Sequence, residues 1–231
     1  MQLFCFTHAG GSAAFFDKLE EACTPEIRLV KTEYPGHGSR RGEKPCSTLR
    51  ELSRDLYKQI RKEYCGGDYA LFGYSMGSVA AMETLHYLTD MGEMPSPMHI
   101  FLASHHPGII DDLSKYDPDQ ADEYIRKRTV SFGGVPEKFA GSETFWRLSM
   151  PALRADYLMI SGYDFETPEF VSDVPASLLY SEQDIPKEGI AKWERFFSGS
   201  CELVEYTGGH FFINVHYTEI AELIKEKLRV K

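Results

Sequence analysis

Short apolar runs alternate along the chain with segments in which apolar residues recur every three or four positions. The apolar runs have the length of buried strands, and the sequence predicts strands at 2–7, 27–34, 69–72, 98–104, 176–181 and 201–206. The periodic segments predict helices at 12–23, 48–60, 78–88, 187–197 and 215–229. Strands that alternate with helices form a mostly parallel sheet with helices on both faces. The pattern therefore predicts an α/β fold.

Two of the predicted helices have a recognisable start. Ser12 precedes the first periodic segment, in the position of an N-cap. Thr48 and Glu51 have the spacing of a capping box, in which each side chain bonds to the backbone N–H of the other residue. Both features favour helices that begin at these points.

The alternation of strand and helix stops in the middle of the chain. Residues from about 106 to 173 are rich in charge, proline, glycine and aromatic side chains, with helical segments at 118–128 and 142–157. This stretch is too long for an ordinary loop. We therefore expect one domain over 1–231, with a helical lid inserted at about 106–173 over one end of the sheet.

Composition and charge exclude several classes of partner. The 231 residues carry a formal net charge of −10, which argues against nucleic acid. No apolar run approaches the roughly 18 residues of a membrane-spanning helix, and the first residues predict a strand rather than a signal peptide. The five cysteines lack Cys-x-x-Cys spacing, so neither a disulfide framework nor a zinc site is expected. We expect a cytoplasmic protein without a metal or a membrane contact.

A Gly-x-Ser-x-Gly motif lies in the stretch LFGYSMGSVAAM. It follows a predicted strand and precedes a predicted helix, which is the setting of a nucleophile elbow. Gly73 and Gly77 would let the backbone pack closely around a strained turn, with Ser75 above the N-terminus of the helix. The alternative is that Ser75 is an ordinary serine in a glycine-rich loop.

A serine nucleophile needs a general base, and histidine is the usual one. His210 lies late in the chain on a Gly-Gly turn that follows a predicted strand, so we identify it as the base. His216 is the rival, but it falls within the last predicted helix. His86 and His99 fall within a helix and a strand, and we expect both to be structural.

The base must be oriented by a carboxylate, which also stabilises the imidazolium that forms. Asp184 directly follows a predicted strand and is the expected acid. Asp111 and Asp112, which follow the preceding strand, are the alternatives. The order Ser75, Asp184, His210 is the serine–acid–histidine order of α/β-hydrolases.

The oxyanion that develops during acyl transfer needs at least two hydrogen-bond donors. The backbone N–H of Met76, at the start of the elbow helix, is the first candidate. The second should come from the turn after the first strand, from Ala9 or from His8. Three further histidines lie on turns near the same edge of the sheet and could line a pocket: His37, His105 and His106.

Motifs along nearly the whole chain match one family. FTHAGGSAAFF resembles a Phe-Pro-x-Ala-Gly-Gly opening, EYPGHGSR a Pro-Gly-x-Gly-x-Arg turn, and LFGYSMGSVAAME a Gly-His-Ser-Met-Gly elbow. SFGGVPEKF and MPALRADYLMI resemble lid motifs, and YSEQD and GGHFFI match the acid and base segments. The chain thus resembles the stand-alone (type II) thioesterases of nonribosomal peptide and polyketide pathways, in the α/β-hydrolase superfamily. Thr7 and Tyr74 depart from the family pattern, where proline and histidine are usual.

The resemblance implies hydrolysis of acyl thioesters on the phosphopantetheine arm of acyl- or peptidyl-carrier proteins. Ser75 would form an acyl-enzyme that water then cleaves with the help of His210, and the enzyme itself would need no cofactor. The implied role is the clearing of wrongly primed or stalled acyl groups in antibiotic biosynthesis, by a monomer. Three alternatives remain: a general serine esterase or lipase on small esters, an acyltransferase, and a catalytically silent binding module.

An acyl pocket is expected between the lid and the sheet. The residues assigned to it are His8, Tyr74, Phe132, Phe139, Trp146 and Phe211, with Phe145, Met150 and Tyr157 as further candidates. The alternative is that these side chains pack the lid onto the sheet. Carrier domains are commonly acidic, as is this chain, so we expect a weak and partly apolar dock near the lid. The basic triplet Arg126, Lys127 and Arg128 is expected to help it.

Overall fold

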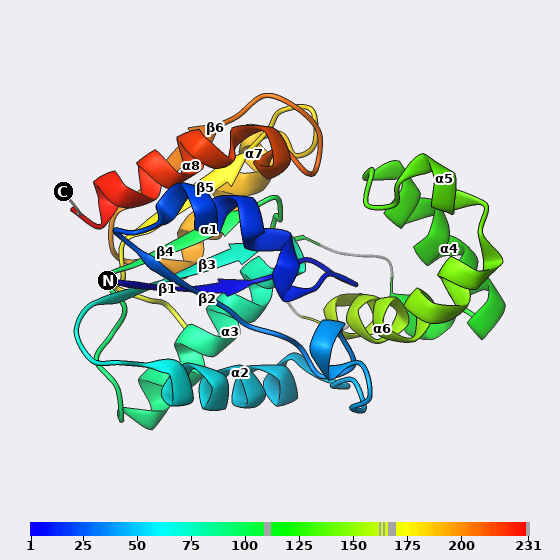
Figure 1. Cartoon of the computed structure of the whole chain (residues 1–231), viewed down its shortest axis with the longest axis horizontal. Helices are drawn as coiled ribbons and strands as arrows, with labels where there is room; N and C mark the ends of the chain where they lie inside the picture. Colours follow the sequence, from blue (N-terminus) through cyan, green and yellow to red (C-terminus); the bar gives the residue numbers. More distant parts are fainter. Residues whose placement is uncertain (109–111, 162, 164, 166–169, 230–231) are drawn as a thin grey trace.

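One parallel sheet forms the centre of the molecule (Figure 1). The computed structural model describes residues 1–108, 112–161, 163, 165 and 170–229. Within them, six strands pair in the order β2-β1-β3-β4-β5-β6, and every pair is parallel. The strands are β1 (Gln2–Phe6), β2 (Arg28–Lys31), β3 (Tyr69–Tyr74), β4 (His99–Ala103), β5 (Ala176–Tyr180) and β6 (Cys201–Glu205). The predicted parallel sheet is confirmed.

Helices connect the strands. They are α1 (Asp17–Cys23), α2 (Leu49–Glu63), α3 (Met76–Met91), α4 (Pro118–Ser131), α5 (Glu137–Ala140), α6 (Glu143–Ser161), α7 (Lys187–Ile190) and α8 (Ile213–Lys227). Short 3-10 turns add η1 (Ala13–Phe16), η2 (Gly38–Arg40), η3 (Leu113–Lys115) and η4 (Ala191–Phe196). None of the helices in these described stretches is long and apolar enough to cross a membrane.

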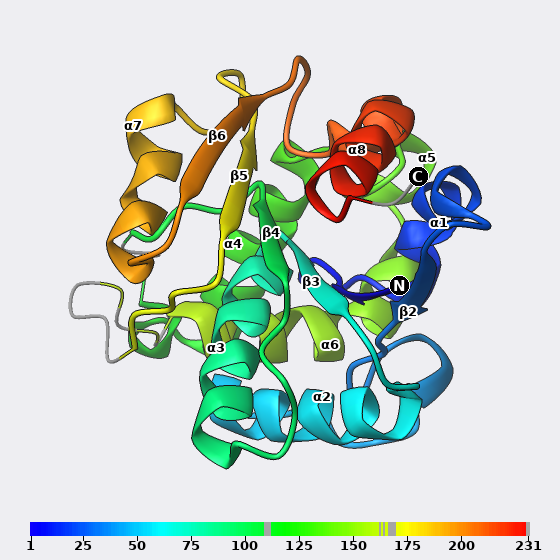
Figure 2. The same ribbon diagram turned by 90° about the vertical axis from the view of Figure 1, so that its left-hand side faces the viewer.

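Two layers of helices bury the two faces of the sheet (Figures 1 and 2). Alternate residues of a strand point to opposite faces, and in β1 every side chain is buried. Phe4 and Phe6 belong to the core shared with α2 and α3. Leu3 and Cys5 belong to the core shared with α1 and α8. The prediction of helices on both faces is therefore confirmed, and the uninterrupted apolar runs follow from this double burial.

The helix starts differ in detail from the sequence expectation. Ser12 lies at the N-cap of the 3-10 turn η1 instead of α1, and its side chain makes no capping hydrogen bond. At the start of α2, Thr48 accepts from the backbone N–H of Glu51, as a capping box requires. The Glu51 carboxylate, however, binds the N–H and hydroxyl of Ser47 instead of the N–H of Thr48. One of the two hydrogen bonds of the predicted capping box is therefore formed. The Glu51 side chain binds Ser47 in place of the second.

The stretch between β4 and β5 carries α4, α5 and α6, which lie together beyond one end of the sheet (Figure 1). These helices have a hydrophobic core of their own, formed by Leu113, Ile125, Val135, Trp146, Met150, Leu153 and Tyr157. Arg154 of α6 binds Asp122 of α4 at 2.7 Å, and Arg126 of α4 binds Glu143 of α6 at 2.9 Å. The segment is thus a small helical unit, which we call the lid.

The approach of α3 to β1 yields a stability prediction. A Cβ atom on Gly77 would lie 2.0 Å from the carbonyl oxygen of Phe6, a backbone atom that cannot move aside cheaply. Alanine normally stabilises a helix by about 1 kcal/mol over glycine, but this clash outweighs that gain. We expect Gly77→Ala to lower the free energy of unfolding by about 3 kcal/mol, as measured by urea denaturation.

Gly141→Ala is the matched control, since a Cβ atom there meets nothing within 4 Å and the φ of Gly141 is −91°. It should change the free energy of unfolding by less than about 0.5 kcal/mol. Equal stability of Gly77→Ala and the unsubstituted protein would contradict the steric argument.

Candidate active site

The turn between β3 and α3 holds Ser75 in a strained backbone conformation. Its φ is 54° and its ψ is −122°, values that a residue with a side chain rarely adopts. The Ser75 N–H donates to the carbonyl oxygen of Ala103 at 2.7 Å. A Cβ atom on Gly73 would lie 2.3 Å from the carbonyl oxygen of Gly77, so the turn needs glycine there as well. These contacts are those of a nucleophile elbow, with Ser75 at the N-terminus of α3.

Ser75, His210 and Asp184 meet at the carboxyl edge of the sheet. Ser75 Oγ lies 3.0 Å from His210 Nε2, and His210 Nδ1 lies 2.8 Å and 3.0 Å from the two oxygens of Asp184. A carboxylate only accepts, so the ring proton is on Nδ1 and Nε2 is free to accept the serine proton. The side chains of His210 and Asp184 are 6% and 5% exposed, which shields the pair from water.

The rival residues lie in other surroundings. The His216 ring bonds to Thr207 and Glu219. Asp112 caps the η3 turn through its hydrogen bond to the N–H of Ser114, and Asp111 lies outside the described residues. Among the candidates that the structure describes, only His210 is within hydrogen-bonding distance of the Ser75 hydroxyl, and only Asp184 binds the His210 ring.

The two histidines expected to be structural are held by neighbours of their own. His86 stacks on Phe170, with ring centroids 4.7 Å apart. His99 Nε2 lies 2.9 Å from the buried hydroxyl of Ser177, and burial lowers the pKa of His99 to about 4. Neither ring is among the cavity-lining side chains.

Tyr74 supports the loop that carries His210. Its ring is fully buried, and its hydroxyl donates to the carbonyl oxygen of His210 at 2.7 Å. The Ser104 hydroxyl lies 2.8 Å from the same oxygen, and Ser104 has a φ of 52°. The sequence placed Tyr74 in the substrate pocket, whereas the ring lies beneath the loop that carries His210. Ser104 was missed, although it directly follows a strand at the carboxyl edge.

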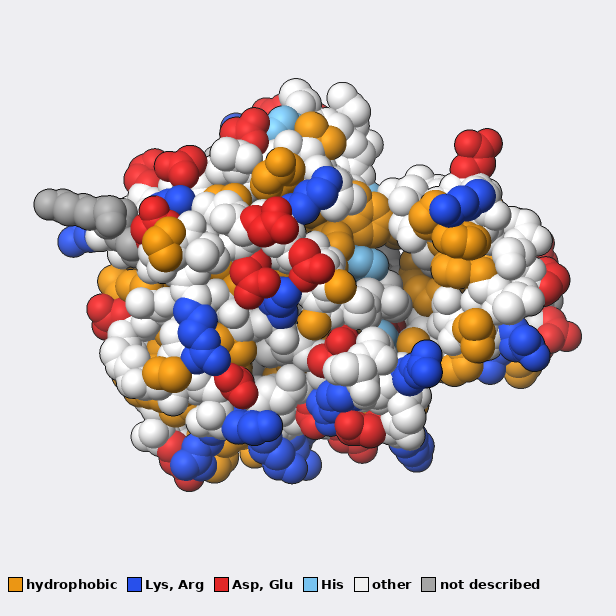
Figure 3. All heavy atoms as spheres, in the orientation of Figure 1, with side chains coloured by type: hydrophobic (Ala, Val, Ile, Leu, Met, Phe, Trp, Pro, Cys, Tyr) orange, Lys and Arg blue, Asp and Glu red, His pale blue; other side chains and the backbone are white. Residues whose placement is uncertain are grey.

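A cavity of about 250 Å³ lies beside Ser75, between the sheet and the lid. The three candidate catalytic residues share it with Ser104, His105, His106, Tyr124, Tyr157 and Phe132. Histidine side chains are visible in the hollow between the sheet and the lid (Figure 3). Burial lowers the pKa of His105 to about 3, so its ring is neutral at pH 7. His105 and His106 thus line the pocket, as the sequence suggested, and contribute neutral polar surface.

The lid aromatics divide between the cavity and the lid core. Phe132 stacks on the imidazole of His210, with ring centroids 4.1 Å apart. Trp146 instead lies in the lid core, where its Nε1–H donates to the carbonyl oxygen of Ala140 at 2.8 Å. Phe139 is 40% exposed and stacks on Phe145. Of these side chains, only Phe132 reaches the cavity, because helical packing turns the others inward or outward.

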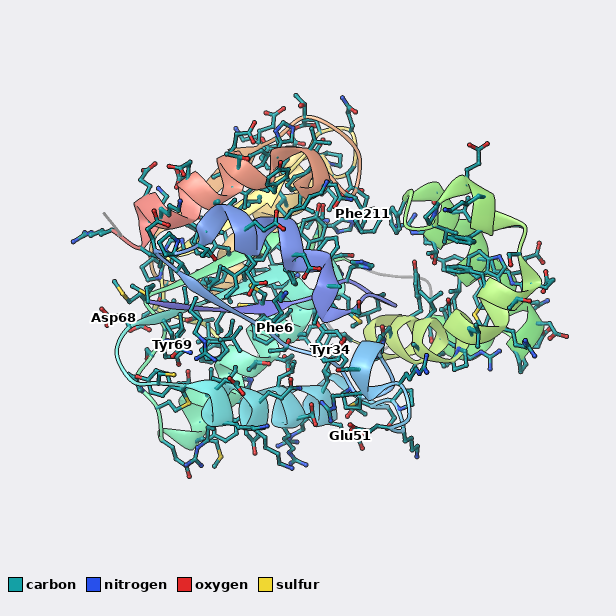
Figure 4. The ribbon with its side chains drawn as sticks, in the orientation of Figure 1. Phe6, Tyr34, Glu51, Asp68, Tyr69 and Phe211 are labelled. Carbon is teal, nitrogen blue, oxygen red and sulfur yellow. The ribbon has the colours of Figure 1, made fainter. Side chains whose placement is uncertain are left out.

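The candidate oxyanion donors come from two elements next to the Ser75 turn in the sheet. Met76 begins α3, and Ala9 lies on the loop after β1. Neither backbone N–H has a hydrogen-bond acceptor among the residues that the structure describes. His8 makes edge-to-face contact with Phe211, which lies on the side of the sheet that faces the lid (Figure 4). Burial lowers the pKa of His8 to about 4, so its neutral ring donates from Nδ1 to the carbonyl oxygen of Ala9.

This strand–turn–helix site agrees with the comparison to known protein families. A family model described as the thioesterase domain matches residues 1–228. The chain belongs to the thioesterase family. This confirms the predicted family, enzyme class and fold. The protein is a thioesterase of the serine hydrolase class.

Similar thioesterases include both curated proteins and solved structures. Thioesterase PikA5 of Streptomyces venezuelae is 30% identical over all of this chain and 82% of its own length. ClbQ, from the colibactin NRPS/PKS pathway, is 26% identical with a TM-score of 0.87, over 99% of this chain and 96% of its own. The type II thioesterase BorB, from the borrelidin biosynthetic cluster, is 27% identical with a TM-score of 0.84, over 99% and 92%.

The two hydroxyls behind the His210 loop predict a kinetic defect. Replacing both, as Tyr74→Phe with Ser104→Ala, leaves the buried carbonyl oxygen of His210 without its side-chain donors and loosens the position of the imidazole. We expect kcat for a small acyl thioester to fall by about 10-fold, which corresponds to about 1.4 kcal/mol, with little change in KM.

Tyr69→Phe is the control for this double variant. Tyr69 lies at the other end of β3, away from Phe211 and the lid (Figure 4), and its hydroxyl also donates to a backbone carbonyl oxygen, that of Pro95. It should leave kcat unchanged. A kcat in the double variant that matches Tyr69→Phe would show that the loop does not depend on these hydroxyls.

Proposed function

We propose that this thioesterase hydrolyses acyl groups from the phosphopantetheine arm of carrier proteins in nonribosomal peptide or polyketide assembly, with Ser75, His210 and Asp184 as its catalytic triad. The observation that carries the proposal is the continuous hydrogen-bond path from the Ser75 hydroxyl through His210 to the Asp184 carboxylate. These three side chains line a cavity that the lid covers.

The reaction proceeds in two halves. Ser75 Oγ attacks the thioester carbonyl carbon while His210 Nε2 takes the hydroxyl proton. The N–H groups of Met76 and Ala9 hold the resulting oxyanion. The intermediate collapses, the C–S bond breaks, and the proton on His210 passes to the departing sulfur. A water molecule, deprotonated by His210, then cleaves the acyl-enzyme to a free acid and restores Ser75.

A thioester suits this site chemically. The leaving thiol has an ordinary pKa of about 8.5, so its departure demands less of the general acid than amide cleavage does. The hydrolysis needs no cofactor of the enzyme itself, since phosphopantetheine enters as part of the substrate. The alternatives of an oxygen-ester hydrolase and an acyltransferase use the same triad and differ in the leaving group or the acceptor.

Carrier proteins are the proposed partners because the similar proteins ClbQ and BorB come from biosynthetic assembly pathways. In the basic triplet of α4, Arg126 is paired with Glu143 and Lys127 with Glu123. Arg128 has no carboxylate partner within the described part of the chain; it lies over the outer face of Phe132 at 4.4 Å and lines the cavity. The docking role expected of the triplet therefore falls to Arg128. The expected monomer stays a prediction.

The nucleophile is tested by Ser75→Ala with carriers loaded with different acyl groups, analysed by mass spectrometry before and after exposure to the enzyme. We expect turnover to fall by about 10⁴-fold or more, with an unchanged melting temperature because the side chain is small. The same acyl group as an oxygen ester, and an added alcohol or amine acceptor, serve as comparisons. Residual activity near that of the unsubstituted protein, or faster cleavage of the oxygen ester, would contradict the proposal.

Charge reversal at Arg128 tests the proposed contact with the carrier protein. Arg128→Glu should raise KM for an acyl-carrier several-fold, because an unpaired cation at the cavity becomes an anion that repels an acidic partner. KM for a small acyl thioester should rise less, because Arg128 lines the cavity but a small substrate brings no acidic partner. Lys127→Glu, on the same helix but already paired with Glu123, should have the smaller effect. Equal changes for carrier and small substrate would reject a docking role for Arg128.

A further inference from the structure

A buried ion pair joins the lid to the sheet domain on the side of the oxyanion loop. Asp156 of α6 lies 2.8 Å from His37 of the turn that follows β2, and both side chains are 2% exposed. The same carboxylate oxygen accepts from the backbone N–H of Gly10 at 2.7 Å. One lid carboxylate therefore holds two loops that are distant from it in the sequence, and the proposed catalytic steps use none of these groups.

His37 is fixed as a cation by its two neighbours. Its Nδ1 lies 3.0 Å from the carbonyl oxygen of Pro35, and its Nε2 faces the Asp156 carboxylate. Both partners only accept, so both ring nitrogens must donate, which requires the imidazolium. Burial alone would lower the pKa of His37, but the hydrogen bond and charge of Asp156 raise it, with smaller contributions from the Pro35 carbonyl and then Glu33.

The peptide unit between Ala9 and Gly10 is held from both sides. Its N–H donates to Asp156, and its carbonyl oxygen accepts from His8 Nδ1 at 3.0 Å. Gly10 has a φ of +71°, and a Cβ atom there would lie 2.4 Å from Leu153 Cδ2, also of α6. Ala9 itself packs against the lid core. The lid helix thus fixes this loop by both packing and a charged hydrogen bond.

We propose that Asp156 is a positioning residue that aims the Ala9 N–H at the oxyanion by clamping the Ala9–Gly10 peptide. This inference rests on the proposed function, because Ala9 matters only if it stabilises the oxyanion. Loss of the clamp would free ψ of Ala9 and φ of Gly10, so that the loop carrying the Ala9 N–H could move relative to Ser75. Because Asp156 belongs to α6, the second oxyanion donor is aligned only while the lid helix is seated.

Two substitutions at Asp156 separate positioning from simple support. Asp156→Leu keeps the approximate shape and removes the acceptor. Asp156→Asn removes the charge but can place its amide oxygen where the Gly10 N–H and the His37 Nε2–H both donate, so it keeps the clamp. Asp122→Leu and Asp122→Asn are matched controls, since Asp122 forms a partly buried ion pair with Arg154 within the same lid.

The measurement is steady-state hydrolysis of a small acyl thioester, together with the affinity of a trifluoromethyl ketone that forms a tetrahedral adduct with the serine. Asp156→Leu should lower kcat by about 10- to 100-fold, since the loss of one oxyanion donor costs 10²- to 10³-fold. It should weaken binding of the ketone by a similar factor and leave KM within about 3-fold of that of the unsubstituted enzyme. Asp156→Asn should restore both to within about 3-fold of the unsubstituted enzyme. Both Asp122 variants should match that enzyme.

Melting temperatures ensure that each variant is assayed while folded. An unchanged kcat in Asp156→Leu, or equal losses in Asp156→Leu and Asp156→Asn, would overturn the inference, as would a kcat loss without weaker ketone binding. Failure of a fluorophosphonate to label Ser75 in the unsubstituted protein would reject the proposed function and this inference with it. Labelling at Ser75 combined with an insensitive Asp156→Leu would reject the inference alone.

Discussion

The close approach of α3 to β1 is the constraint on which the site depends. Gly77 lies so near the carbonyl oxygen of Phe6 that no side chain fits between them. This contact draws the N-terminus of the helix against the sheet and leaves Ser75 at the apex of a turn with a positive φ. Backbone packing at this contact therefore sets the positions of the proposed nucleophile Ser75 and of Met76, and brings the end of β1 against the same turn.

The remaining members of the proposed triad reach this region because parallel strands end at the same edge of the sheet. Asp184 follows β5 and His210 follows β6, while Tyr74 and Ser104, at the ends of β3 and β4, bind the carbonyl oxygen of His210 from below. Neighbouring strands thus supply both the reacting side chains and the groups that hold them. The family membership of the chain agrees with this arrangement, and relatives of known structure share the fold over nearly their whole length.

The sequence predicted what depends on local pattern. Apolar runs located the strands because both faces of the sheet are buried, and the turn after each strand pointed to Ser75, Asp184 and His210. Contacts between distant segments left no such signal: His37 and Gly10 are 119 and 146 residues away from Asp156. Nor did helical periodicity reveal which lid aromatics turn towards the cavity. Trp146 fills the lid core and Phe132 stacks on the His210 imidazole, although the sequence shows both only as large aromatic residues.

The separate core of the lid has a consequence for how substrate preference can change. Since Trp146 and its neighbours hold α4 and α6 to each other, the side chains that the lid contributes to the cavity, among them Phe132 and Tyr157, would travel together as a preformed wall. Substitutions among these lid residues can then change the preference for acyl groups, while the residues of the proposed triad on the sheet stay the same.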